Sequence, residues 1–152
     1  MPRHSNIHER ANFALLWTVY EGIVLNASGN AAAIKRAVDL LKSEGRLSLD
    51  RVLPMIRYFR DRYFDCIDLT HEFHSLHMRR NDDSNLVERV LRGKSNDDSE
   101  VLSAALIIIY RLRNNLFHGV KWSYGIRGQL GNFQNANAVL MAVIEMHLSK
   151  SI

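Results

Sequence analysis

Apolar residues recur along this chain at steps of three and four, the spacing that places them on one face of an α-helix. Most of the pattern falls into five segments, at about residues 6–25, 31–44, 84–91, 101–117 and 132–149. A further, long helix is expected to be capped by Ser48 or Asp50 and to reach about Met78, with Pro54 in its first turn. We therefore predict an all-α fold, an up-and-down bundle of five to six helices that forms a single domain over residues 1–152.

The composition limits the class of protein. With 152 residues, of which 47% are hydrophobic and 24% charged, the chain suits one globular domain with its own core. No apolar run approaches the roughly 20 residues that cross a bilayer, and the N-terminus lacks the apolar core of a signal peptide. Cys66 is the only cysteine, so no internal disulfide can form, and we expect its side chain to be buried. These features predict a cytoplasmic protein without membrane contacts.

Positive charge is unevenly distributed along the chain. The net charge is +4, yet residues 101–144 contain no Asp or Glu. The same stretch holds Arg111, Arg113, Lys121 and Arg127, whose charges have no acidic neighbour in the sequence. Such a stretch favours an anionic partner.

The helix expected at residues 101–117 is the most apolar of the set. Its middle, residues 104–110, is apolar nearly all round, which predicts that it is the central helix of the bundle. A stripe of Leu102, Leu106 and Ile109 along this helix has Arg113 as its next member. An arginine therefore stands where an apolar residue is expected.

Two further polar side chains converge near Arg113. Asn114 and His118 are four residues apart and share a helix face, and Arg113 has the reach to join them. Arginine binds phosphate oxygens with a fixed fork of donors, and histidine titrates near neutral pH and can move protons. RNA supplies its own nucleophile, the 2′-hydroxyl, so this set of groups needs neither a metal nor a cofactor for phosphodiester cleavage.

Spacing alone leaves a second interpretation open. Arg113 could extend to solvent or pair with Glu21, while His118 caps the C-terminus of the helix. In that case the three polar residues have a structural role only.

The string Arg113-Asn-Asn-Leu-Phe-His118, followed by Gly119 and Lys121, resembles the signature of HEPN domains. In that family an Arg and a His are separated by four to six residues near the C-terminal end of a helix late in a helical bundle. The segment Ala14-Leu-Leu-Trp-Thr-Val-Tyr-Glu21 is also similar to the first helix of many members. The resemblance is specific over about 20 residues around the motif and loose over the rest of the chain.

This resemblance implies a metal-independent endoribonuclease of the toxin–antitoxin or phage-defence type. Its site would be composed of two motifs that meet at the interface of a homodimer. Arg113 would stabilise charge on the scissile phosphate, His118 would assist proton transfer, and Asn114 would orient them. The apolar excess at residues 104–110 adds to the expectation of a dimer, formed through the motif helix and the last helix. An antitoxin or another defence protein is a further expected partner.

Around this motif we expect five residues to bind RNA and two to support the site. The expected RNA-binding residues are Lys121, Arg127, Arg111, Trp122 and Tyr124. The two aromatic residues could stack on bases, or pack in the core or at the dimer interface. Asn115 and Glu21 are the expected supporting residues.

Two other classes of function remain open. Some HEPN members have lost catalysis, so the chain could be a nucleotide- or protein-binding module in a regulatory or toxin–antitoxin complex. A structural helical adaptor explains the bundle but not an arginine on an apolar stripe. His71, His74 and His77 follow one another at steps of three, but this spacing drifts around a helix and favours a solvated face over a zinc site.

Overall fold

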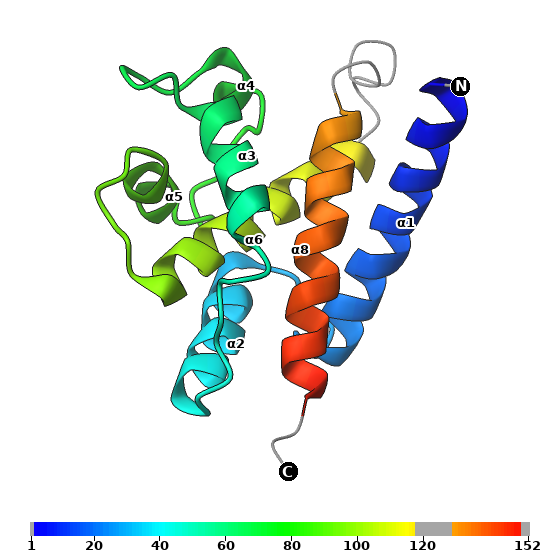
Figure 1. Ribbon diagram of the computed structural model, residues 1–152, viewed down its shortest axis with the longest axis vertical. Coiled ribbons are helices and arrows are strands. Elements are labelled where there is room, and N and C mark those ends of the chain that lie inside the picture. The colour runs from blue at the N-terminus through cyan, green and yellow to red at the C-terminus, as the bar shows by residue number, and fades with distance from the viewer. Residues whose placement is uncertain (1, 118–128, 150–152) are drawn as a thin grey trace.

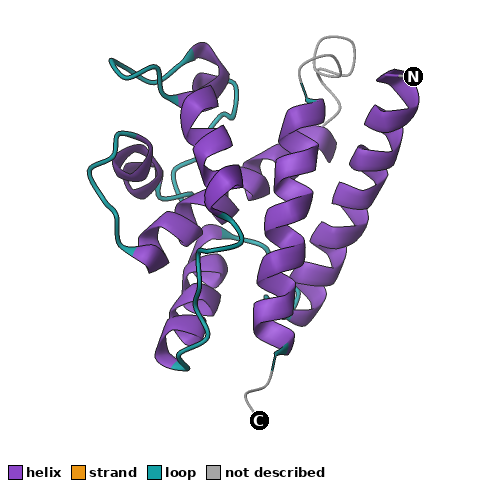
Figure 2. Ribbon diagram, viewed as in Figure 1, coloured by secondary structure: helices purple, strands orange, loops and turns teal. Residues whose placement is uncertain are grey.

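The computed structural model describes residues 2–117 and 129–149, and within them the chain forms an all-α bundle of seven helices (Figures 1 and 2). These are α1 (Pro2–Ile23), α2 (Ala31–Ser43), α3 (Leu53–Tyr63), α4 (His71–His74), α5 (Ser84–Leu91), α6 (Asp98–Phe117) and α8 (Leu130–Leu148). The predicted fold class is confirmed. Within these ranges no strand forms, and one isolated bridge pairs Phe64 with Leu69. None of the described helices is long and apolar enough to cross a membrane.

Side-chain caps fix the ends of the helices that the sequence located best. Asn30 starts α2, because its Oδ1 accepts a hydrogen bond from the backbone N–H of Ala33 (2.8 Å). Gly45 follows α2 with φ +70°, a left-handed conformation that costs glycine little. Asp83 starts α5, with its Oδ1 bonded to the backbone N–H of Leu86 (3.3 Å). The predicted ends at these positions agree with the structure.

The prediction of one long helix reaching Met78 is wrong, because the structure has two separate helices, α3 and α4, in this region. The N-cap residue of α3 is Val52, which makes no side-chain capping hydrogen bond. Pro54 lies in the first turn of α3, as predicted. The helix stops at Tyr63, because Phe64 is extended and a tight turn follows. In that turn Oδ1 of Asp65 accepts hydrogen bonds from the backbone N–H groups of residues 67 and 68 (2.9 and 2.8 Å). Thr70 then caps the short helix α4.

The same turn also corrects the expectation for the only cysteine. Cys66 lies at the turn with φ +77°, and its side chain is exposed where we predicted a buried packing residue. The expectation followed from the general tendency of free cysteines to be buried, and the helix that was predicted to contain Cys66 does not form at this position.

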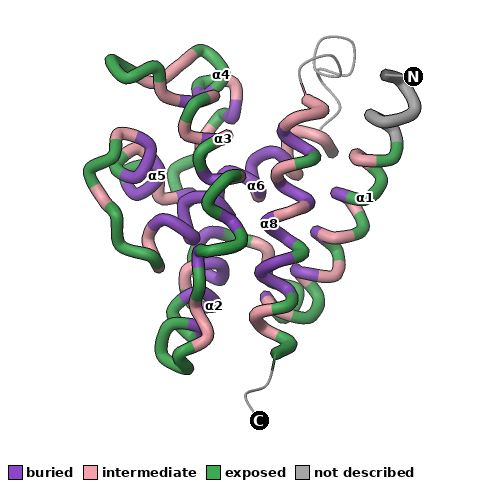
Figure 3. Tube along the Cα trace, viewed as in Figure 1, coloured by how far each residue is buried: buried purple, intermediate pink, exposed green. Residues whose placement is uncertain are grey.

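The core is built around α6. Leu102, Leu106, Ile107 and Ile109 have no solvent exposure, and α6 packs against α1, α2, α3, α5 and α8. Figure 1 shows α6 crossing behind α8, while α1 and α8 lie side by side and run in the same direction. Buried segments concentrate on α6 and on the helix faces turned toward it (Figure 3). The prediction of a central helix is therefore confirmed.

This central position removes one argument for a dimer. Residues 104–109 are all buried in the core of a single chain, so their apolar surface is not available to a second copy. The apolar excess that the sequence offered as a dimer surface is used within the monomer. The expectation of a dimer then depends on the family resemblance alone.

Candidate functional site

The last turn of α6 leaves the core and is partly accessible. Residues 113–116 are half-buried, whereas residues 101–109, 111 and 112 are buried. Nη1 of Arg113 donates a hydrogen bond to Oδ1 of Asn114 (3.1 Å). The structure therefore brings together two of the three residues that we expected to act in catalysis, at a place where a ligand can reach them.

Arg111 and Asn115 point to a different neighbour, the segment that follows α4. Nε of Arg111 donates to the carbonyl oxygen of Leu76 (3.1 Å), and Nδ2 of Asn115 donates to those of Ser75 (3.3 Å) and Leu76 (3.2 Å). Nη2 of Arg111 also donates to Oδ1 of Asn115 (3.4 Å). These bonds attach residues 75 and 76 to α6, and a role for Asn115 in supporting the motif stays a prediction.

Asp82 completes this arrangement, which we name the Arg111 clamp: Arg111, Asn115 and Asp82. Oδ2 of Asp82 lies 3.5 Å from Nη1 of Arg111, and the side chains of Arg111 and Asp82 are 2% and 7% exposed. The same oxygen accepts a hydrogen bond from the backbone N–H of Arg79 (2.7 Å). A buried guanidinium is thus neutralised and bonded, as a buried charge requires.

Sequence reasoning missed this clamp. It placed Arg111 among the RNA-binding residues and did not connect it with Asp82. A direct contact between Arg111 and RNA stays a prediction. The burial of the Arg111 side chain favours a role in positioning other residues. The i, i+4 spacing of Arg111 and Asn115 was the one available signal.

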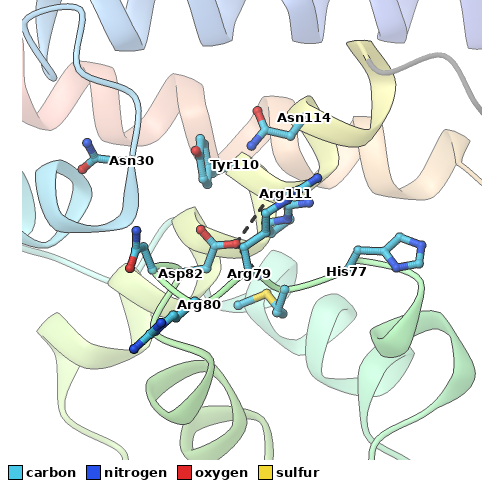
Figure 4. A pocket seen from close by; sticks show the side chains of 10 residues that line it. Asn30, His77, Arg79, Arg80, Asp82, Tyr110, Arg111 and Asn114 are labelled. Atoms are coloured by element: carbon cyan, nitrogen blue, oxygen red, sulfur yellow. Dashed lines mark hydrogen bonds and ion pairs between the residues drawn. The ribbon is translucent and has the colours of Figure 1, made fainter.

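Beside the clamp lies a groove of about 840 Å³ between α6, the start of α2 and residues 77–82. We name it the basic groove, and its polar lining consists of Asn30, His77, Arg79, Arg80, Asn81, Asp82, Tyr110, Arg111 and Asn114. Figure 4 shows Arg79 beside Arg111 and Asp82, while Arg80 and His77 extend away on opposite sides. Asn114 lines this groove and also bonds to Arg113, so the groove and the motif share a residue.

The electrostatics of the groove are dominated by arginine. Burial lowers the pKa of Arg111, the carboxylate of Asp82 opposes that shift, and the positive charge of Arg79 adds to it. Arg111 nevertheless stays protonated near neutral pH, because a guanidinium loses its proton only under strongly alkaline conditions. Two guanidinium groups therefore lie close together beside one carboxylate, which leaves a net positive charge.

Glu21, one of the two expected supporting residues, bonds to a residue on its own helix and not to Arg113 or Asn114. Its Oε2 accepts a hydrogen bond from the indole Nε1 of Trp17 on the same helix (2.8 Å). The ring of Trp17 in turn packs against that of Tyr110, with 5.9 Å between ring centroids. Glu21 is thus connected to the wall of the groove through two aromatic rings.

Several predicted site residues cannot be placed. His118, Lys121, Trp122, Tyr124 and Arg127 lie outside the described residues, so their position beside Arg113 stays a prediction. The three histidines at steps of three do not share a helix, since His71 and His74 belong to α4 and His77 follows it with φ +53°. Among residues 2–117 and 129–149, no three His, Cys, Asp or Glu side chains are grouped to hold a metal ion.

Comparisons of the chain with protein-family models, with curated proteins and with solved structures found no match. The interpretation of the site accordingly depends on its residues and on the resemblance carried by the motif.

Proposed function

We propose that this protein is a metal-independent endoribonuclease of the HEPN type, with Arg113, Asn114 and His118 as its catalytic residues. The observation that carries the proposal is the half-buried pair of Arg113 and Asn114, at the accessible end of a central helix and next to a basic groove. An arginine at such a position can contact a phosphate without the cost of full burial. The motif sequence supplies the histidine.

In the proposed reaction the 2′-hydroxyl oxygen of RNA attacks the adjacent phosphorus, and the bond from phosphorus to the 5′-oxygen breaks. The products are a 2′,3′-cyclic phosphate and a 5′-hydroxyl, so one proton leaves the nucleophile and one reaches the leaving oxygen. His118 would assist this proton transfer. Arg113 would stabilise the charge that develops on the phosphate, with Asn114 fixing the orientation of its guanidinium.

In this proposal the protein acts as a homodimer in which two motifs form a composite site, and an antitoxin or other defence protein controls it. The family resemblance supports both partners. Light scattering at tens of micromolar tests the dimer, and a monomer at that concentration would remove the composite site.

Incubating the purified protein with RNA in a metal chelator tests the activity. We expect the wild-type protein to cleave and to leave cyclic phosphate ends, while Arg113→Ala and His118→Ala do not cleave. Arg57→Ala is the matched control, since Arg57 is an exposed arginine on α3 that does not line the groove. A chelator-resistant nuclease activity that survives both motif substitutions would place the active site elsewhere.

A second candidate function, a non-catalytic nucleotide-binding module, is favoured by one specific observation. The basic groove has the volume of pockets that bind small ligands, roughly 300–1,000 Å³, and its lining combines arginine and amide side chains. Binding of a nucleotide by a protein that cleaves no RNA under any condition would favour this alternative.

A further inference from the structure

The basic groove contains a turn that presents arginine in a fixed position. The backbone N–H of Asp82 bonds to the carbonyl oxygen of Arg79 (3.0 Å), and Oδ2 of Asp82 accepts the backbone N–H of Arg79 (2.7 Å). The same carboxylate is paired with Arg111 on α6. The backbone of Arg79 is therefore attached to the central helix through one buried carboxylate. Because this backbone is already fixed, less conformational entropy is lost when a ligand binds.

The side chain of Arg79 is exposed to the groove, and its charge is not neutralised there. Among the described residues that line the groove, Asp82 is the only acid, and its carboxylate is occupied by Arg111. Two other exposed arginines pair with carboxylates, Arg89 with Glu100 and Arg51 with Glu145. The positive charge of Arg111 lies near that of Arg79 (Figure 4). Two like charges held close together are stabilised when an anion binds between or beside them.

Amide side chains complete the lining. Asn30 and Asn114 come from the start of α2 and the end of α6, and Asn81 lies on the turn itself. Amides donate to phosphate oxygens and ribose hydroxyls and accept from base edges. Asn30 also marks the N-terminus of α2, whose first turn carries no acidic residue and adds a partial positive charge.

We propose that the basic groove is a phosphate subsite for the RNA chain, in which Arg79 binds a phosphate next to the one that is cleaved. Arg111 and Asp82 are positioning residues, since they hold the backbone of Arg79 and not the RNA. Asn114 connects the subsite to Arg113, because it lines the groove and bonds to the motif arginine. The choice of RNA as ligand rests on the proposed function, whereas the binding of a phosphate follows from the groove itself.

The test measures binding separately from cleavage. A fluorescent single-stranded oligonucleotide with 2′-O-methyl groups has no free 2′-hydroxyl, so it binds without being cut. Its affinity for the full chain is measured by anisotropy at several salt concentrations, for the wild type, Arg79→Ala and the control Arg57→Ala. We expect Arg79→Ala to weaken binding about 10-fold at low salt and to reduce the slope of log K against log salt by about 0.7. Arg57→Ala should change neither quantity, and all three proteins should melt at the same temperature because both side chains are exposed.

The outcomes separate this proposal from the proposed function. If Arg79→Ala binds like the wild type, or if Arg57→Ala loses as much affinity, the subsite does not exist, even where Arg113-dependent cleavage is intact. If binding depends on Arg79 but no RNA is ever cut, the proposed nuclease activity is wrong and the phosphate site stands.

Adenosine monophosphate is the second arm of the test: we expect it to bind more weakly than the oligonucleotide, because it offers a single phosphate. Equal affinity would overturn the assignment to an RNA chain and identify a free nucleotide as the ligand.

Discussion

Arg111 and Arg113 are two residues apart on one helix, but they differ in burial and in hydrogen-bond partners. The guanidinium of Arg111 is buried, paired with Asp82 and bonded to a backbone carbonyl. That of Arg113 is half-buried and bonded to Asn114 at the margin of an open groove. One arginine attaches a distant segment to the core, and the other is partly accessible at the end of the helix. The two arginines show that the partner groups, more than the residue type, decide how deeply an arginine in an apolar helix is buried.

The largest effect is expected where the clamp is broken. Arg111→Ala leaves the carboxylate of Asp82 buried without its cation and removes the bond to Leu76, so we expect the free energy of unfolding to fall by about 3–5 kcal/mol. Urea denaturation followed by circular dichroism measures this loss. The double variant Arg111→Met, Asp82→Leu removes both charges together and should recover a large part of it. A loss below about 1 kcal/mol for Arg111→Ala would show that the two arginines are not energetically distinct.

The next largest effect concerns activity at unchanged stability. Arg113→Ala should reduce RNA cleavage at least about 100-fold, which corresponds to about 2.7 kcal/mol of transition-state stabilisation. Its melting temperature should be about unchanged or slightly higher, because residues kept for function often reduce stability. Thermal melts and cleavage rates measured on one preparation check both halves. If Arg113→Ala unfolds as readily as Arg111→Ala, the pair of Arg113 and Asn114 is a second structural clamp.

The difference between the two arginines also explains which parts of the molecule the sequence predicted. The course of α6, its central position and the positions of α2 and α5 follow from local patterns, since each depends on residues a few positions apart. The clamp does not, because Asp82 comes from a distant part of the chain. The acid-free stretch at residues 101–144 led us to expect that Arg111 is unneutralised. An arginine in a stretch of sequence without acidic residues can still pair with an acidic residue from elsewhere in the fold, as Arg111 does with Asp82.

The error in the third helix has a local cause of another kind. Residues 64–70 keep a helical spacing of apolar positions, and no glycine or proline interrupts them. Asp65 and Thr70 nevertheless bond to nearby backbone groups and stabilise a turn and a new helix start. Such competition between side chain and backbone is not visible in hydrophobic periodicity. It matters for the site, because the turn and α4 precede the segment that the Arg111 clamp holds.

Acidification should lower the stability of the protein through a residue outside both regions. Burial lowers the pKa of His147 to about 4, and the charge of Arg46 adds to the shift while Glu44 opposes it. Because the unfolded chain binds a proton near pH 6.5, stability is complete above that pH and falls as the pH drops from 6.5 toward 4. Up to about 2 kcal/mol should be lost over this range, since the side chain of His147 is only partly buried.

Chemical denaturation at a series of pH values checks this, with His147→Gln as the variant that should flatten the profile. Arg113→Ala should follow the wild-type profile, since Arg113 lies near the end of α6 and His147 lies in the last turn of α8. An identical pH profile for wild type and His147→Gln would assign the acid sensitivity to other groups.

The smallest expected effects come from the neighbouring pair Asn114 and Asn115, which repeats the contrast between the two arginines with amides. Asn115 donates to the carbonyl oxygens of Ser75 and Leu76, so Asn115→Ala should cost about 1–2 kcal/mol of unfolding free energy. Asn114 bonds to Arg113 at the groove, so Asn114→Ala should change stability by no more than about 0.5 kcal/mol while slowing cleavage. Urea denaturation and single-turnover cleavage rates on the two variants, prepared side by side, measure the contrast. Equal losses of stability from the two substitutions would mean that the boundary between the structural and the functional part of α6 does not lie between these residues.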